Sequence, residues 1–252
     1  MQNKRSLEEI IESLYALHES IPKIQVDEST RRTAIMAHGW YMSLIRTSKA
    51  VLALDKLGFG HEAAPMRRSM LEHALGIVWL SVAGEDAVNS IIKAYQDVTF
   101  KKIKESIQGT SETELLQLVR EYVPFDVAPS SEGSYLHFKH LCERFGVHRL
   151  YIAWLRNTSL SHASFSSAVA YVDSVDGSLI LLREPNLSEP PDSLSSSNEI
   201  AALLLLATNA FSDLLVNKPW KSQITQIEQE LSNIVGFKLD THDTTQSDDR
   251  KK

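Results

Sequence analysis

The fold is decided by residues 62–84, EAAPMRRSMLEHALGIVWLSVAG. Apolar side chains recur there every three or four residues, which is the spacing of one face of an α-helix. Pro65 suits the first turn of such a helix, and Gly84 ends it. Because the apolar stripe is nearly continuous, we expect this helix to be central. The stripe consists of Met66, Met70, Leu71, Ala74, Leu75, Val78 and Trp79.

The same spacing extends over most of the chain. It predicts further helices at about 6–19, 29–57, 85–107, 111–122, 135–145, 148–161, 198–215 and 224–234. Ser111 and Glu114 have the spacing of a capping box. Residues 168–182 instead alternate around Asp176-Gly177, which is typical of a β-hairpin turn. The predicted fold class is therefore all-α, a multi-helix bundle with a small inserted β-hairpin near 168–182.

No internal repeat or domain linker divides the chain. We therefore expect a single helical domain at 1–240, with an exposed Pro- and Ser-rich connection at 184–197. The last residues, 241–252, are polar and charged without periodicity, which predicts a disordered C-terminal tail.

Composition predicts a cytoplasmic protein. Cys142 is the single cysteine among 252 residues, so an internal disulfide is excluded, which fits a reducing compartment. Acidic residues interrupt the first twenty positions, so no export signal is expected. The apolar run Ile200–Ala207 is far shorter than the roughly 20 residues of a membrane span. A net charge of −6 argues against a broad nucleic-acid surface but leaves room for a local phosphate site.

Most signatures of common enzyme classes are missing from the sequence. Gly58-Phe59-Gly60 lacks the lysine of a phosphate-binding loop and follows a helix rather than a strand. The sequence has neither paired metal-binding cysteines nor a Gly-x-Ser-x-Gly nucleophile motif. No cofactor is expected.

Arg68 and Glu72 are the first residues with functional potential. They are four positions apart, so they share one face of the central helix and can form an ion pair. A surface pair of this kind contributes only about 0.5 kcal/mol. The alternative is that the pair borders a polar cleft, which the apolar neighbours of the two residues favour.

A second polar group closes the predicted helix at 148–161. It comprises Arg156, Asn157, Ser161 and His162. On a straight helix, residues six apart point about 120° from each other, so Arg156 and His162 would not be adjacent. Either the helix ends near Ser161 and the chain turns His162 back, or a second protomer completes a site. The plainer alternative is an exposed arginine and a capping histidine.

This group resembles the signature of HEPN-domain proteins, the higher-eukaryote and prokaryote nucleotide-binding superfamily. Those proteins are helical bundles in which a late helix carries an arginine, a spacer of four to six residues and a histidine. Arg156, Asn157 and His162 match with a five-residue spacer. Arg68–Glu72 together with Tyr151–His162 also resembles an uncharacterised group of bacterial helical proteins. The hairpin and the long C-terminal helix depart from the simplest HEPN bundle.

The resemblance implies a metal-independent endoribonuclease, a toxin or phage-defence effector. His162 would be the general acid or base at the ribose 2′-hydroxyl, and Arg156 would stabilise charge developing at the phosphate. Asn157 would orient a phosphate or the imidazole. The resemblance further implies an RNA substrate, a homodimer with its site at the two-fold interface, and an antitoxin or regulator as protein partner.

Two other functions stay open. One is a non-catalytic helical binding protein, whose polar cleft around Arg68, Glu72 and Arg156 holds a small anionic ligand or a protein partner. The other is a metalloenzyme that uses His38, Glu72 and His73, or the pair His137 and His140. The tryptophans Trp40, Trp79 and Trp154 are expected in the core rather than as a platform for bases.

Overall fold

The computed structural model describes residues 5–20, 24–106, 111–123, 127–175, 178–186 and 196–235. Helix accounts for 76% of this part of the chain, which confirms the all-α bundle with a small hairpin. The α-helices are α1 (Leu7–Glu19), α2 (Arg31–Lys56), α3 (Ala64–Ala83), α4 (Glu85–Ser106), α5 (Glu112–Tyr122), α6 (Phe138–Arg144), α7 (His148–Ser161), α8 (Phe165–Val169), α9 (Ser196–Asp213) and α10 (Lys221–Val235). The other elements are 3₁₀ helices at Glu28–Thr30 and Glu132–Leu136 and the strands β1 (Val172–Val175) and β2 (Ser178–Leu181).

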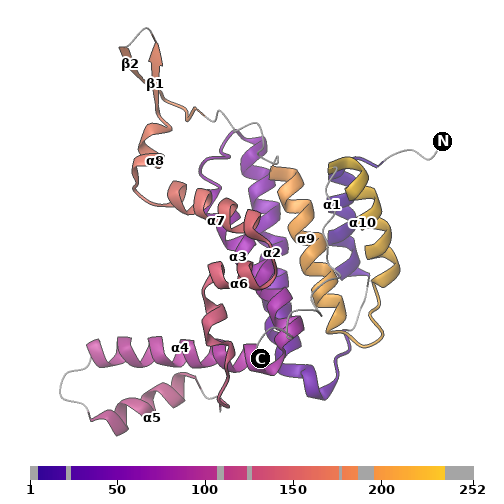
Figure 1. The fold of residues 1–252 in the computed structure, drawn as a ribbon, viewed down its shortest axis with the longest axis vertical. Helices are drawn as coiled ribbons and strands as arrows, with labels where there is room; N and C mark the ends of the chain where they lie inside the picture. Colours follow the sequence, from indigo (N-terminus) through magenta and orange to yellow (C-terminus); the bar gives the residue numbers. More distant parts are fainter. Residues whose placement is uncertain are drawn as a thin grey trace, which may run out of the picture.

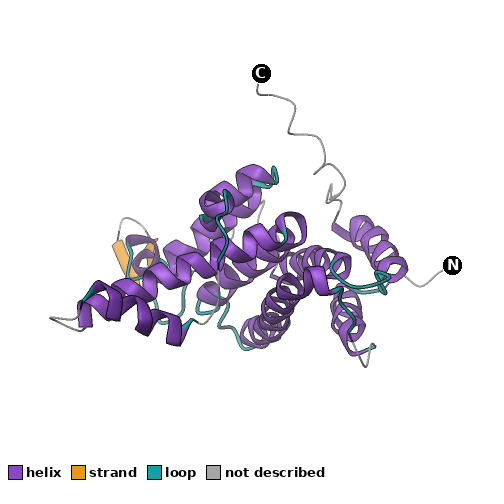
Figure 2. Ribbon diagram, turned by 90° about the horizontal axis from the view of Figure 1, so that it is seen from below, coloured by secondary structure: helices purple, strands orange, loops and turns teal. Residues whose placement is uncertain are grey.

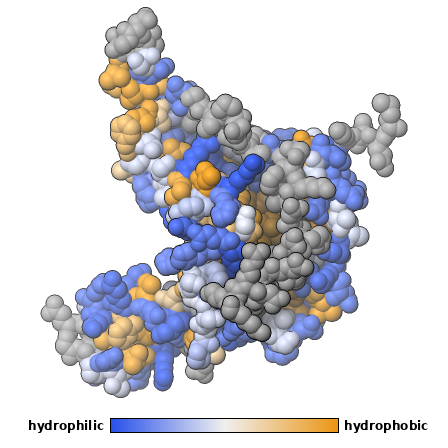
Figure 3. All heavy atoms as spheres, viewed as in Figure 1, coloured by the Kyte–Doolittle hydropathy of each residue, from blue (hydrophilic) through white to orange (hydrophobic). Residues whose placement is uncertain are grey.

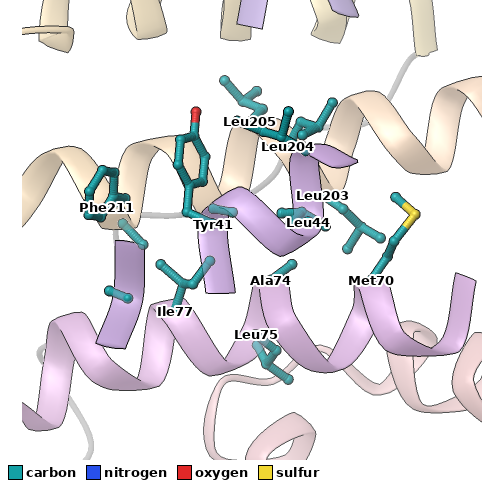
Figure 4. Close-up of a cluster of buried hydrophobic side chains, with 14 of the residues drawn as sticks. Tyr41, Leu44, Met70, Ala74, Leu75, Ile77, Leu203, Leu204, Leu205 and Phe211 are labelled. Atoms are coloured by element: carbon teal, nitrogen blue, oxygen red, sulfur yellow. The ribbon is translucent and has the colours of Figure 1, made fainter. Parts of the chain in front are cut away.

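Helix α3 is central, as its apolar stripe predicts. It packs against α2, α7 and α9 (Figure 1). Figure 4 shows buried side chains of α2, α3 and α9 in the zone where the three helices meet. The rings of Tyr41 and Phe211 stack there with centroids 5.0 Å apart, and the Tyr41 hydroxyl lies 2.9 Å from Thr208 Oγ1. This buried hydrogen bond satisfies the polar tip of an otherwise apolar contact.

One glycine sets how closely α2 approaches α3. A Cβ atom on Gly76 would lie 2.6 Å from Cζ3 of Trp40, closer than two carbon atoms can pack. Gly76 thus makes room for the indole of Trp40 against the middle of α3.

A single hydrophobic cluster joins the N-terminal and C-terminal helices. It runs from Ile10 on α1, through α2, α3 and α9, to Leu231 on α10. The described helices from α1 to α10 thus share one core, while the predicted boundary at 240 lies outside the described residues. None of the described helices has both the length and the apolar content needed to cross a membrane.

Two arms extend from the bundle (Figure 1). One is the antiparallel pair α4–α5, and the other carries α8 and the hairpin beyond the end of α7. The capping box predicted at Ser111 and Glu114 is present at the start of α5. Figure 2, seen from below, shows the strands partly behind helices on one side of the molecule. Between the arms the surface is hollowed and largely hydrophilic (Figure 3).

The structure differs from the sequence prediction around the hairpin and in α6. Residues 165–169 form α8, so the hairpin starts only at Val172, which pairs with Leu181 in antiparallel register. The helix expected at 135–145 is divided, because His137 has an extended backbone between the 3₁₀ helix and α6. The Asp176-Gly177 turn and the tail at 241–252 lie outside the described residues.

Candidate functional site

Arg68 lies at the centre of a polar network between α3 and α7. Its Nε donates to Glu72 Oε1 at 3.2 Å, which confirms the predicted ion pair. The indole Nε1 of Trp154 donates to the same oxygen at 2.7 Å. The guanidinium carbon lies 4.7 Å from the centroid of the Trp154 ring, a cation–π contact. Glu72 and Trp154 together hold the Arg68 side chain against α7.

The free end of the Arg68 guanidinium faces His162. Nη1 of Arg68 and Nε2 of His162 are 3.4 Å apart. Helix α7 ends at Ser161, and His162 is its C-cap with an extended backbone (φ −119, ψ 160). The helix ends near Ser161, as one of the two expected geometries requires, but the turn brings His162 to Arg68 and not back to Arg156. Ser167 Oγ donates to the His162 carbonyl at 2.8 Å, which ties α8 to this turn.

A hydrogen bond between Arg68 and His162 requires one tautomer of the imidazole, because the roles of the ring nitrogens depend on where the proton lies. A guanidinium only donates hydrogen bonds, so Nε2 of His162 must accept. Such an acceptor is the imidazole tautomer that carries its proton on Nδ1. An anion that accepts this hydrogen bond from Arg68 in place of His162 leaves Nε2 free to act as a base.

Arg156 does not meet His162 within one chain. Its side chain is exposed, and among the described residues none makes a hydrogen bond or ion pair with its guanidinium. The predicted catalytic pair thus lies on one helix end without a direct contact. The arginine that approaches His162 is Arg68, from 94 positions away in the sequence.

Asn157 occupies a different place from the one that the HEPN resemblance implies. It is only 5% exposed. Its Oδ1 accepts from Arg67 Nε at 3.1 Å, and its Nδ2 donates to the Ala153 carbonyl at 2.9 Å. Arg67 also lies 3.6 Å from Asp55. This placement favours a structural role for Asn157, joining α7 to α3, over contact with a substrate.

Ser161 closes the last turn of α7. Its Oγ donates to the Asn157 carbonyl at 2.5 Å, four residues earlier on the same helix. Ser164 Oγ likewise donates to the Ser159 carbonyl. These hydroxyls fix the end of α7 and with it the backbone of His162.

Aromatic rings flank the network. Trp154 stacks with Tyr151 at 5.9 Å and with Phe138 at 5.6 Å between centroids. Trp154 is only half-buried at the edge of the core, whereas Trp79 is buried as expected, and its Nε1 donates to Glu132 at 2.7 Å. The polar role of Trp154 was missed, because its partners Glu72 and Arg68 lie on another helix.

The histidines of the described residues do not assemble a metal site. His38 lies beside His18, with 3.3 Å between their Nε2 atoms, while His73 lies 3.3 Å from Ser69 Oγ, and burial lowers the pKa of His73. His137 and His140 are neighbours with ring centroids 5.6 Å apart. Within the described ranges, no group of three or more His, Cys, Asp or Glu side chains is placed to hold a metal ion. The geometry does not support the metalloenzyme alternative.

Residues 34–179, more than half of the chain, match a family model described as "Family of unknown function (DUF5677)". The chain belongs to this family. The matched segment runs from α2 to the hairpin and contains Arg68, Glu72, Arg156 and His162. No curated protein and no solved structure matches the chain significantly. The family description names no activity, so the likeness to HEPN-domain proteins stays a proposal.

Proposed function

We propose that this protein is a HEPN-like, metal-independent endoribonuclease in which His162 is the acid–base group. The observation that carries this proposal is the 3.4 Å approach of the Arg68 guanidinium to the exposed imidazole of His162. An accessible base can accept the proton of a ribose hydroxyl, and a cation beside it can stabilise the charge that develops on the neighbouring phosphate. Glu72 and Trp154 support it, because they orient Arg68 before any substrate arrives.

The proposed reaction starts when a phosphate of RNA accepts a hydrogen bond from Nη1 of Arg68, in place of His162. Nε2 of His162 is then free to accept the proton of the adjacent 2′-hydroxyl. The 2′-oxygen attacks phosphorus, the bond from phosphorus to the 5′-oxygen breaks, and the leaving oxygen takes a proton from water or from the imidazolium. The products are a 2′,3′-cyclic phosphate and a 5′-hydroxyl. DNA lacks the nucleophile and is not cleaved.

Arg156 supplies the second cation in this proposal. Since it does not reach His162 within one chain, the proposal includes a homodimer in which it serves a site shared between protomers. A protein antitoxin or regulator, a cytoplasmic location and a toxin or phage-defence role belong to the same proposal by analogy alone.

The charge around the site favours RNA over other substrates. Residues 137–162 carry four Lys or Arg and one acidic residue, in a chain whose net charge is −6. These residues form α6, α7 and the turn at His162, which adjoin the Arg68 network. Within this stretch Lys139 pairs with Glu143 and Arg144 with Glu132, so Arg149 and Arg156 are the exposed cations of α7 that can attract a phosphate.

The test is cleavage of labelled single-stranded RNA by the full chain, with a chelator present and with DNA as a parallel substrate. We expect His162→Ala to slow cleavage by about 10²–10⁴-fold. The matched control is His148→Ala, because His148 is an exposed histidine at the other end of α7 and lies outside the network. The control should cleave at the wild-type rate, and product analysis should show 2′,3′-cyclic phosphate ends.

Two results would overturn the proposal. Cleavage that survives His162→Ala would remove the histidine from the mechanism. A wild-type chain inert on diverse RNAs, yet able to bind them or a small anion through Arg68, would favour the non-catalytic binding protein.

A further inference from the structure

Helix α7 has two unpaired cations and no carboxylate. Its sequence, HRLYIAWLRNTSLS, contains neither Asp nor Glu. Arg149 and Arg156 are exposed, and within the described ranges neither guanidinium makes a hydrogen bond or an ion pair. Helix α6 differs, because its Lys139 and Arg144 are both paired with acidic side chains. Between residues 137 and 162, the arginines that can meet a charged ligand therefore lie on α7.

The two arginines lie on one side of the helix. Seven residues make almost two full turns, so Arg149 and Arg156 are separated by roughly 10 Å along the axis and point in nearly the same direction. Between them, Ile152 is 66% exposed and Leu155 45%. Asn157 is buried on the opposite side, where it contacts α3. We call the outward side the α7 face; it comprises Arg149, Ile152, Leu155 and Arg156.

The α7 face combines the two kinds of group that a single strand of nucleic acid needs. Such a strand carries a negative phosphate at every nucleotide, and arginine donates to phosphate oxygens in a planar, bidentate manner. Every base also has a flat π-face that can lie against an exposed apolar side chain. An acidic peptide satisfies the arginines, but it offers no flat rings to Ile152 and Leu155.

The local charge changes sign beyond the end of α7. Residues 163–182 contain two aspartates and neither lysine nor arginine, so this stretch repels phosphates. At the junction of the two regions, Nη1 of Arg68 lies 3.4 Å from Nε2 of His162. A strand whose phosphate reaches Arg68 is therefore attracted along α7 and not over α8 and the hairpin.

We propose that the α7 face binds the RNA strand next to the cleaved bond, with Arg149 as a phosphate anchor remote from the reaction. The position of the cleaved bond rests on the proposed function; the binding of the strand does not. Nearly the full length of α7, roughly 20 Å, separates Arg149 from His162, so Arg149 does not touch the reacting atoms. Its effect is on binding, and the preferred substrate is a strand several nucleotides long.

The first test is binding of the full chain to a 2′-O-methyl RNA strand, which lacks the nucleophilic hydroxyl. Fluorescence anisotropy gives the Kd at several salt concentrations. Arg149→Ala should raise the Kd and reduce the slope of log Kd against log salt by about 0.7, the value for one phosphate contact to a single strand. Arg149→Lys keeps the charge and should keep the slope. The matched control is Arg120→Ala, which changes an exposed arginine of α5 on the other arm and should bind as the wild type does (Figure 1).

The second test is cleavage of two RNA substrates, a strand long enough to span α7 and a dinucleotide. A dinucleotide has one phosphate between its nucleosides, which occupies the reaction site and cannot also reach Arg149. Arg149→Ala should therefore lower kcat/KM for the long strand, through KM, far more than for the dinucleotide. An equal loss on both substrates would indicate a structural effect and overturn the assignment of Arg149.

The outcomes separate this inference from the proposed function. Strand binding that depends on Arg149, in a chain that cleaves no RNA, overturns the ribonuclease and upholds the α7 face. Cleavage by an Arg149→Ala variant with the wild-type Kd and salt slope does the reverse. Displacement of the strand by poly-glutamate of equal charge would show attraction of any polyanion and overturn the α7 face as a nucleic-acid site. A chain that neither binds nor cleaves the strand overturns both.

Discussion

Neighbouring residues on α7 have opposite surroundings. Arg156 is exposed, whereas Asn157 is 5% exposed and hydrogen-bonded on both sides, to Arg67 and to the Ala153 carbonyl. Consecutive positions on a helix point about 100° apart, so one side chain can face solvent while the next faces α3. The two residues can therefore be tested separately, although the HEPN resemblance assigns both to one site.

Arg156→Ala and Asn157→Ala should have contrasting effects. Arg156→Ala should change the free energy of unfolding by no more than ~0.5 kcal/mol, while slowing RNA cleavage if the proposed function holds. Asn157→Ala should cost about 1–3 kcal/mol, because it removes the hydrogen bonds of the buried amide to Arg67 Nε and to the Ala153 carbonyl. Urea unfolding followed by circular dichroism gives both stabilities. Equal stability losses in the two variants would contradict the structural role of Asn157.

Local spacing explains which contacts at the site were predictable. Arg68 and Glu72 are four apart on one helix, so the sequence predicts their ion pair directly. Trp154 is 82 positions from Glu72, and His162 is 94 from Arg68, so only the packing of α7 on α3 brings them together. Helical periodicity identifies the apolar face of α7 but not the position along α3 at which α7 crosses it.

At the scale of elements, the capping residues explain why the start of α5 was predicted and α8 was not. Ser111 followed by Glu114 has the usual capping-box residues, and α5 starts there as predicted. Ser164 caps α8 with Ser167 in the place of the usual Glu or Gln, so the short helix carries no recognisable signal. Because the residues that follow alternate between apolar and polar, the sequence predicts a hairpin that starts at Ala168, within what is the end of α8.

Glycines on α2 and α3 should respond to alanine with opposite signs. Gly76→Ala places a Cβ against Trp40 and should destabilise the protein by about 1–3 kcal/mol through overpacking. Gly39→Ala is the matched control, because nothing lies within 4 Å of its added Cβ in the exposed middle of α2. It should stabilise by about 0.5–1 kcal/mol, since alanine favours helix over glycine. Thermal or urea unfolding of both variants measures these changes. A Gly76→Ala variant with the wild-type free energy of unfolding would contradict the prediction, because it would show that Trp40 moves aside without cost.

Docking of α1 on α2 should weaken in acid. The pKa of His18 is lowered from its ordinary value of 6.5, chiefly by burial and then by His38, while Glu19 opposes the shift. Tyr41 adjoins the His18 ring on α2, and Phe211 on α9 adjoins His38. The unfolded chain binds more protons below pH 6.5 than the folded one, so stability is full above that pH and falls as the pH drops through the lowered pKa. Burial of His73 acts in the same direction.

The measurement is Tm as a function of pH for the wild type and for His38→Gln. Removing the second imidazole should raise the pKa of His18 toward its ordinary value and reduce the loss of Tm in acid. His148→Gln serves as the control, since His148 is exposed and outside this pair. Identical acid slopes for His38→Gln and the wild type would exclude the pair as a cause.

At the scale of the whole molecule, the hydrophobic core extends beyond the segment that matches the family. Residues 34–179 match the family, but α9 lies beyond them and packs on α2 and α3. Leu204 and Phe211 of α9 are fully buried, and Thr208 is 2.9 Å from the Tyr41 hydroxyl. The apolar stripes of α3 and α9 predict that both helices are buried, but their spacing does not reveal that one covers the other.

We expect the chain to unfold as one unit and the isolated segment 34–179 not to fold. Without α9, the faces of α2 and α3 around Tyr41 and Ala74 would be exposed to water, and each buried large apolar side chain contributes about 1.5–3 kcal/mol. That loss exceeds a typical domain stability of about 5–15 kcal/mol once several such contacts are removed. A chain ending at 240 is the control, because the sequence predicts a disordered tail after it. The truncated segment should show little helix by circular dichroism, while the control should melt in one transition at the wild-type Tm. A cooperative, helical 34–179 would place the domain boundary at the family limits and α9 outside the folding unit.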